Sequence, residues 1–199
     1  MRRGLLGGTF DPPHIGHLLL AEEARRKLCL DEVVFIPAGQ PWVKASMPVS
    51  PSADRLEMVA LATADNPCYS VNDIEVKRPG PSYTWQTLEE LRCQYPGDEL
   101  YFILGWDNLC SLPSWHRPGR IVQAACLVAA PRIGSPRPDL HDLDAMVPGL
   151  AARTVILTEP EIDISATAIR ERVKLGLPIG HLVPQPVVEY IASHGLYRG

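Results

Sequence analysis

Apolar and polar positions along the chain alternate between strand-like and helix-like periods. Strands are predicted where short apolar runs stop at Gly, Pro or polar residues: 4–6, 33–36, 70–76, 100–104, 126–129 and 155–157. Helical spacing lies between them and predicts helices over 17–28, 52–64, 84–94 and around 121–123. Two further helices, 166–174 and 186–194, are predicted as a C-terminal helical segment. Strands that alternate with helices indicate an α/β fold, a parallel sheet with helices on both faces.

A single domain is predicted over residues 1–199. An apolar share of 46% is enough for a full core, and no internal repeat or low-complexity segment divides the chain. The Pro-, Gly- and Asp-rich stretch 131–149 is predicted as a surface loop. In such sheets ligands bind beyond the carboxyl ends of the strands. The first candidates are therefore the residues that follow Leu6, Ile36, Leu104 and Ala129.

Charge and cysteine content narrow the classes of partner. Nineteen Lys and Arg against 23 Asp and Glu give a net charge of -4, which disfavours a nucleic-acid backbone or an anionic membrane as partner. The longest apolar run, 124–130, is shorter than the roughly 20 residues of a membrane span. Five scattered cysteines without a Cys-x-x-Cys pair predict reduced thiols in a cytoplasm. No pattern indicates an oligomeric state.

The loop at 7–17, between the first strand and the first helix, has the composition of a phosphate site. Gly7 and Gly8 let the backbone approach a ligand, and the helix start offers unpaired N–H groups. His14 and His17 are three residues apart and can face the same side, adding imidazole donors. The alternatives are a tight turn with capping or half-buried histidines, or a metal site. No carboxylate or third histidine is visibly placed to complete a metal site, so none is predicted.

These residues resemble a known family. Gly-Gly-Thr-Phe-Asp-Pro at 7–12 with His-x-Gly-His at 14–17 looks like the signature of the nucleotidyltransferase superfamily of adenylyl and cytidylyl transferases. His-x-Gly-His also occurs in class I aminoacyl-tRNA synthetases, but their Lys-Met-Ser-Lys-Ser loop is absent here. Ile-Ser-Ala-Thr-Ala-Ile-Arg at 164–170 is similar to the superfamily's second motif, Ser-x-Thr-x-x-Arg. A capping hydroxyl and a planar cation suit phosphate; a plain helix cap with a surface arginine is the alternative.

Three further stretches, 37–44, 82–87 and 105–115, resemble the bacterial nicotinate mononucleotide adenylyltransferase branch. The resemblance implies a Rossmann-like, doubly wound parallel sheet. It also implies the reaction: ATP and nicotinate mononucleotide give nicotinate adenine dinucleotide (deamido-NAD) and pyrophosphate, by in-line attack on the ATP α-phosphate, in NAD biosynthesis. The attacking phosphate monoester is already anionic, so the absence of an obvious nucleophile and base pair is expected.

The resemblance implies roles for three groups of residues. The catalytic group is His14, His17 and Arg170. The ATP group contains these three and also Gly7, Gly8, Thr9, Phe10, Asp11, Gly105, Asp107, Ser165 and Thr167. The mononucleotide group is Lys44, Tyr83, Thr84, Trp115 and Arg132. For single members the alternatives are a solvated cation, a helix cap or a packed aromatic ring. Mg²⁺ is expected as cofactor, held mainly by ATP phosphates and water.

The sequence departs from the branch at three positions and leaves the acceptor open. Ala166 stands where the branch usually has a second Ser, Trp106 is bulkier than usual, and Ile133 replaces a Pro. Nicotinamide mononucleotide and phosphopantetheine stay as alternative acceptors. A non-catalytic nucleotide-binding regulator is the alternative of a different class. The local positive charge is expected from Lys44, Arg132, Arg170 and a protonated His14 or His17.

Overall fold

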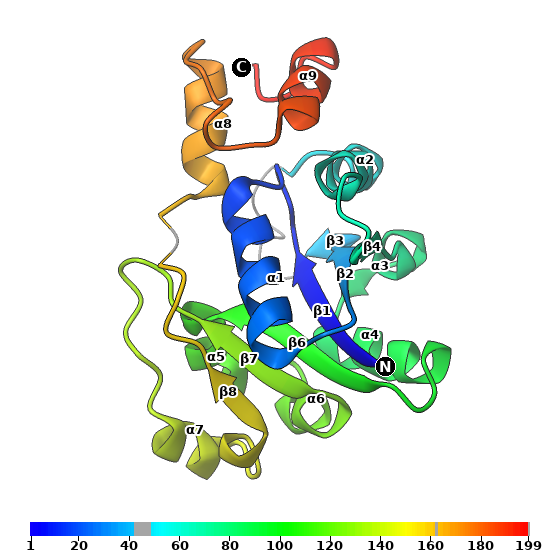
Figure 1. Ribbon diagram of the computed structural model, residues 1–199, viewed down its shortest axis with the longest axis vertical. Helices are drawn as coiled ribbons and strands as arrows, with labels where there is room; N and C mark the ends of the chain where they lie inside the picture. Colours follow the sequence, from blue (N-terminus) through cyan, green and yellow to red (C-terminus); the bar gives the residue numbers. More distant parts are fainter. Residues whose placement is uncertain (42–48, 162, 199) are drawn as a thin grey trace.

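A six-stranded parallel sheet forms the centre of the computed structural model, which describes residues 1–41, 49–161 and 163–198 (Figure 1). Its strands, in chain order, are β1 (Arg2–Gly8), β2 (Glu32–Pro37), β4 (Tyr69–Val71), β6 (Glu99–Gly105), β7 (Cys126–Ala130) and β8 (Thr154–Ile156). Two short strands, β3 (Gln40–Pro41) and β5 (Pro81–Ser82), pair with each other beside this sheet. The helices are α1 (Ile15–Leu28), α2 (Ser52–Thr63), α3 (Ile74–Lys77), α4 (Thr84–Gln94), α5 (Trp106–Ser111), α6 (Pro118–Ala124), α7 (Leu140–Met146), α8 (Ala166–Lys174) and α9 (Gln185–Ser193).

The order of the strands creates a crevice between β1 and β6. In space the order is β4-β2-β1-β6-β7-β8, and every neighbouring pair is parallel. The chain moves outward from β1 to β4, then returns to β6 beside β1 and continues outward on the other side. Connections therefore leave β1 and β6 toward opposite faces, which opens a crevice at their carboxyl ends. This confirms the predicted doubly wound α/β fold.

Apolar runs fill both faces of the sheet. Leu5 and Leu6, neighbours in β1, lie in different buried clusters, because successive strand side chains point to opposite faces. Leu5 packs with the side that carries α4, α5, α6 and α7, and Leu6 with the side that carries α1 and part of α2. Burial on both faces explains why these strands read as continuous apolar runs rather than alternating ones.

The C-terminal helical segment packs on α2 rather than on the sheet. Met58 of α2, Ile169 of α8 and Val187 and Ile191 of α9 belong to a third buried cluster. Figure 1 shows α8 and α9 together beyond the end of the sheet, beside α2. The segment also contacts the start of α1, where the Ile15 N–H donates to the Leu182 carbonyl at 2.9 Å. The C-terminal motif is thereby brought to the first loop.

Two predicted elements were wrong in extent. The strand expected over 70–76 ends at Val71, and α3 follows, because the Asn72 side chain accepts from the Ile74 N–H at 3.0 Å and turns the chain. The stretch 131–149, expected to be a loop, contains α7, which Asp139 caps by accepting from the His141 N–H at 2.9 Å. In the described ranges no helix is both long enough and apolar enough to cross a membrane.

Candidate active site

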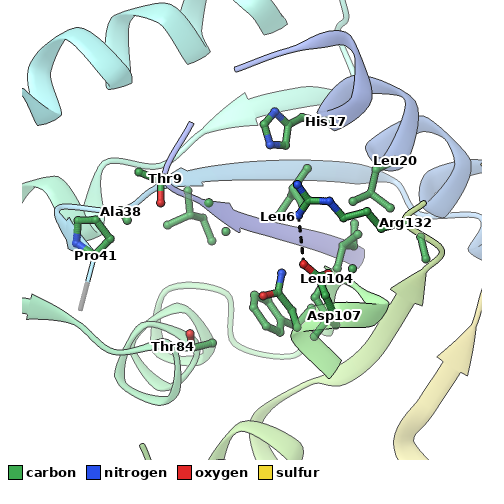
Figure 2. A pocket seen from close by; sticks show the side chains of 18 of the residues that line it. Leu6, Thr9, His17, Leu20, Ala38, Pro41, Thr84, Leu104, Asp107 and Arg132 are labelled. Carbon is green, nitrogen blue, oxygen red and sulfur yellow. Dashed lines mark hydrogen bonds and ion pairs between the residues drawn. The ribbon is translucent and has the colours of Figure 1, made fainter. Parts of the chain in front are cut away.

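One pocket of about 400 Å³ opens at the carboxyl ends of β1, β2, β6 and β7. It therefore lies in the crevice where the strand order reverses, as the connectivity of the sheet requires. Among the residues that line it are ten of the predicted site residues: Gly7, Gly8, Thr9, His14, His17, Thr84, Gly105, Asp107, Trp115 and Arg132. Figure 2 shows His17 on one side of the β1 end and Thr84 and Asp107 on the other. Some members of the predicted ATP group and some of the predicted mononucleotide group therefore line the same pocket.

The two histidines form a stacked pair at the start of α1. Their ring centroids are 3.6 Å apart, and His14 is the N-cap of the helix. The His14 backbone N–H donates to Nδ1 of His17 at 3.1 Å. Because that bond occupies Nδ1 as an acceptor, a neutral His17 ring carries its proton on Nε2. Phe10 supports the same ring edge-on, with centroids 4.9 Å apart.

His14 is buried, and its Nδ1 has no hydrogen-bond partner among the described residues. Burial, together with the positive charge of Arg132, lowers the pKa of His14 to about 4. The imidazole is therefore neutral at pH 7, so of the two histidines expected as a source of positive charge, His14 does not supply it. A buried polar atom without a partner, facing a pocket, is suited to a ligand oxygen.

Asp107 and Arg132, expected in different substrate groups, form an ion pair. Nη1 of Arg132 lies 3.1 Å from Oδ2 of Asp107, and Figure 2 marks this contact with a dashed line. The other carboxylate oxygen, Oδ1, is buried and has no partner within the described part of the chain. It lies so close to Gly105 that a Cβ at that position would overlap it. A glycine before α5 therefore makes room for the carboxylate at the pocket wall.

Thr84 and Trp115 lie on the α4 side of the pocket. Thr84 is the first residue of α4, and Tyr83 is its N-cap. Tyr83 does not line the pocket; its ring packs on His116 with centroids 4.7 Å apart. Trp115 is held by its Nε1–H, which donates to the Ser111 hydroxyl at 3.2 Å, and by edge contact with Phe102. One aromatic face and one helix start therefore line the same wall.

The C-terminal motif lies next to this pocket. Ser165 caps α8 by accepting from the Ala168 N–H at 3.1 Å, and it lines a second pocket of about 250 Å³. Both pockets include Arg132 among their lining residues. Arg170 donates to the Asp11 carbonyl at 2.8 Å and to the Thr167 hydroxyl at 3.3 Å. The motif at 164–170 and the loop at 7–17 are thus joined by a direct hydrogen bond.

Comparison with known proteins identifies the family. The model of the cytidylyltransferase-like family matches residues 5–172, which include both motifs. The chain belongs to the cytidylyltransferase-like family. A relative from Dehalococcoides mccartyi, named "Probable nicotinate-nucleotide adenylyltransferase", is 52% identical over 199 residues, which cover 100% of this chain and 98% of the relative. A relative of the same name from Thermomicrobium roseum is 46% identical over 197 residues, which cover 99% of this chain and 92% of the relative.

Solved structures agree on the fold of this cytidylyltransferase-like chain. The nicotinic acid mononucleotide adenylyltransferase of Plasmodium falciparum, complexed with NaAD, superposes with a TM-score of 0.81 at 16% identity. The superposition covers 98% of this chain and 97% of the other. The same protein complexed with APC gives a TM-score of 0.79. At this identity the likeness supports the fold alone.

Two residues of the family signature that were predicted for ATP, Phe10 and Asp11, make contacts within the protein. The ring of Phe10 is buried against His17 and Phe35. The Asp11 carboxylate is also buried and accepts from the Tyr197 hydroxyl at 2.7 Å and from the Ser50 N–H at 3.3 Å. Neither side chain lines the pocket, because both turn toward the protein interior. Lys44 lies outside the described residues.

Sequence reasoning missed several polar residues of the pocket. Glu75, Ser82, Thr87 and Asn108 also line it. Burial raises the pKa of Glu75, while hydrogen bonds from Thr87 and Ser82 act in the opposite direction. Ser82 and Thr87 stand in the recognised 82–87 segment and could have been identified there. Glu75 had no such signal, since it fell in a segment predicted as a strand.

Proposed function

We propose that this chain is a nicotinate-nucleotide adenylyltransferase, which joins ATP and nicotinate mononucleotide to give deamido-NAD and pyrophosphate. One observation carries the proposal: the stacked histidine pair lines the same pocket as Thr84, Trp115 and Arg132. Identity of 52% over the full chain to a relative of that name supports the same reaction. The reaction belongs to the biosynthesis of pyridine dinucleotides.

The proposed chemistry requires alignment rather than proton abstraction. An oxygen of the mononucleotide phosphate attacks the α-phosphorus of ATP; the new P–O bond forms as the bond to the β-phosphate breaks and pyrophosphate leaves. The nucleophile is anionic at neutral pH, so no general base is needed. Holding both phosphates in line and stabilising the crowded charge can supply most of the rate enhancement.

His14 and His17 act on the ATP phosphates in this proposal. Nε2–H of His17 donates toward the α-phosphate, since Nδ1 is held by the His14 backbone. The neutral His14 offers its unpartnered Nδ1 as a second donor, and a bound phosphate would raise the pKa of this imidazole. Gly7 and Gly8 allow close approach of the backbone, while Ser165, Thr167 and Arg170 hold the leaving pyrophosphate.

The α4 wall of the pocket receives the mononucleotide. Trp115 offers a flat face for the pyridine ring, and the backbone N–H groups at Thr84 and the start of α4 suit its carboxylate. Arg132, fixed by Asp107, supplies positive charge for the mononucleotide phosphate. Lys44 is proposed for the same phosphate. The buried Oδ1 of Asp107 is available to accept from a ribose hydroxyl or from adenine.

Magnesium is proposed to enter with ATP. The described residues contain no group of three or more His, Cys, Asp or Glu side chains that could hold a metal ion. The residues around the pocket therefore fit Mg²⁺ only as an ion that phosphate oxygens and water mainly coordinate. Mg²⁺ usually prefers such ligands. When bound, Mg²⁺ would neutralise phosphate charge.

The proposal includes the cytoplasm as the location of the enzyme. Free thiols support it, since none of the five cysteines, all in described ranges, is paired in a disulfide. Two enzymatic alternatives remain: transfer to nicotinamide mononucleotide or to phosphopantetheine. A non-catalytic regulator would need neither the histidine pair nor Arg170, and the chain has all three.

The direct experiment is product identification. Purified protein is incubated with ATP, Mg²⁺ and nicotinate mononucleotide, and products are separated and identified by mass spectrometry. We expect deamido-NAD and pyrophosphate in equal amounts, with product formation about a thousandfold slower in His17→Ala at the same protein concentration. ATP hydrolysis to ADP or AMP without a dinucleotide would contradict the proposal.

A further inference from the structure

Arg55 of α2 is one of the most buried side chains of the protein, at 1% exposure, although it carries a charge. Its guanidinium donates to three backbone carbonyls: Nη1 to Thr9 at 2.8 Å, Nη2 to Gly39 at 2.9 Å and Nε to Ser50 at 3.0 Å. These three residues belong to separate segments of the chain, the first loop, the loop after β2 and the lead into α2. A single planar group therefore joins three segments.

Two of the three segments border the proposed active site, and the third is hydrogen-bonded to the first loop. Thr9 lines the pocket. Gly39 follows Ala38, which also lines the pocket. Ser50 donates its N–H to the Asp11 carboxylate at 3.3 Å, and Asp11 belongs to the first loop. Arg55 does not line the pocket, and within the described residues its guanidinium donates to the backbone carbonyls of these segments.

The connection continues to the segment proposed for the mononucleotide. The Gly39 N–H donates to the Ser82 hydroxyl at 3.0 Å, and the Ser82 side chain also lowers the pKa of the buried Glu75 carboxyl. The Thr87 hydroxyl donates to Oε1 of Glu75 at 2.7 Å and accepts from Arg78 at 2.9 Å. Hydrogen bonds therefore run from the first loop through Arg55 and Gly39 to Ser82, two residues before the start of α4 at Thr84.

Close packing fixes the middle of this connection. A Cβ at Gly39 would overlap the carbonyl oxygen of Glu75, so the loop after β2 lies directly against α3. The Glu75 carbonyl therefore blocks movement of Gly39 toward α3, and the hydrogen bond from the Gly39 N–H to the Ser82 hydroxyl opposes its movement away from Ser82. We call the series of hydrogen bonds from Thr9 through Arg55 and Gly39 to Ser82 the strut.

Stability alone does not account for a buried arginine here. Burial lowers the pKa of Arg55, and the negative charge of Asp11 compensates only in part. Replacing a buried charge by a well-packed apolar side chain is often neutral or stabilising. A lysine would keep the charge, but its single ammonium nitrogen lacks the planar fork that reaches three carbonyls at once. The arrangement therefore depends on the shape of the guanidinium.

We propose that Arg55 is a positioning residue. It sets the distance and angle between the first loop (7–17), which is assigned to ATP, and the α4 wall of the pocket, which is assigned to the mononucleotide. The proposal rests on the proposed function, because those two walls are assigned from it. Arg55 acts through the backbone of Thr9 and Gly39, so it should affect the alignment of two bound substrates more than the binding of either one. Its signature is a loss in kcat with little change in either KM.

The test uses Arg55→Lys in the full chain, with Arg92→Lys as the matched control. Arg92 also donates to backbone carbonyls, those of Gln123 and Ala124, but it is exposed and does not line the pocket. We expect Arg55→Lys to lower kcat about 100-fold, the size of effect that a misplacement of about 1 Å can cause, with each KM changed by less than about threefold. Arg92→Lys should match the parent protein.

Ser82→Ala provides a second variant that cuts the strut at another point. We expect a smaller loss in kcat, about tenfold, and a double variant whose loss is below the product of the two single losses, because both interrupt one connection. If Arg55→Lys fails to fold, the kcat of Ser82→Ala decides. A kcat within about threefold of the parent in the folded variants, or a loss that follows the folded fraction, overturns the proposal.

Hydrogen–deuterium exchange gives a readout that does not depend on the reaction. In Arg55→Lys, amides at 7–11, 38–40 and 82–87 should exchange faster together, while those of β6 stay unchanged. Faster exchange in the first loop alone overturns the strut. If the parent protein makes no dinucleotide, the proposed function fails, and this exchange pattern still decides whether Arg55 couples the two walls.

Discussion

At the scale of single residues, the two histidines of the first loop have different environments although their rings are stacked. His14 is buried with an unpartnered Nδ1, and His17 has its Nδ1 occupied by the His14 backbone. The same turn thus fixes a donor on Nε2 of His17 and keeps His14 neutral at pH 7. This division could not be derived from the sequence, because burial and backbone direction decide it.

His17→Ala should lower kcat by about a thousandfold, because the variant loses a donor positioned for the crowded α-phosphate. The melting temperature should stay close to that of the parent, since the side chain is only partly buried. Steady-state kinetics and thermal unfolding of the same preparation check both results. An active variant would remove His17 from the reaction.

His14 should lower the free energy of unfolding as the pH is decreased from 6.5 to 4. The pKa of this group is about 4 in the folded protein against an ordinary value of 6.5, so in this window the unfolded state binds more protons. The contribution amounts to about 3 kcal/mol across the window. Denaturant unfolding of the parent and of His14→Gln at several pH values measures it. Parallel curves for the two proteins would contradict the assigned pKa.

Trp115→Ala should raise the KM for the mononucleotide while the KM for ATP stays unchanged. Loss of ring stacking worth about 0.5–1.5 kcal/mol corresponds to about 2- to 13-fold, and lost contact area adds to it. Trp115→Phe should recover part of the effect, because it retains an aromatic face. Equal changes in both KM values would move Trp115 away from the pyridine site.

At the scale of elements, helix starts and strand ends supply most of the site. The strands could be predicted because they are buried on both faces and read as apolar runs, and α4 and α8 begin and end at the predicted residues. Side-chain hydrogen bonds decide two features that the apolar and polar pattern does not predict. Asn72 turns the chain from β4 into α3, and Asp139 caps α7. Glu75 was missed for that reason.

Substitutions at Ser165 separate helix capping from phosphate binding. Ser165→Ala should lower the free energy of unfolding by about 1 kcal/mol, because the Ala168 N–H loses its acceptor. Ser165→Asp should restore stability, since Asp is also a good cap, yet raise the KM for ATP by placing negative charge where phosphates are proposed. Chemical denaturation and kinetics check the pair. An unchanged KM in Ser165→Asp would place ATP phosphates elsewhere.

At the scale of the whole molecule, the net charge of -4 is compatible with binding two anionic substrates, because Arg132 and Arg170 place positive charge beside the pocket. Arg132 and Arg170 lie on separate elements and meet around the first loop only in the folded chain. The family motifs located both in the sequence. The contacts that position these arginines could not be predicted from the sequence. Arg132 pairs with Asp107, 25 residues away, and Arg170 with the carbonyl of Asp11, 159 residues away.

The preferred acceptor distinguishes the proposed reaction from its two enzymatic alternatives. Pyrophosphate release is measured with ATP, Mg²⁺ and, separately, nicotinate mononucleotide, nicotinamide mononucleotide and phosphopantetheine at equal concentrations. We expect the highest kcat/KM with nicotinate mononucleotide, at least about tenfold above that with nicotinamide mononucleotide, because the helix-start N–H groups at Thr84 favour a carboxylate. Equal rates with all three acceptors, or a preference for phosphopantetheine, would contradict it.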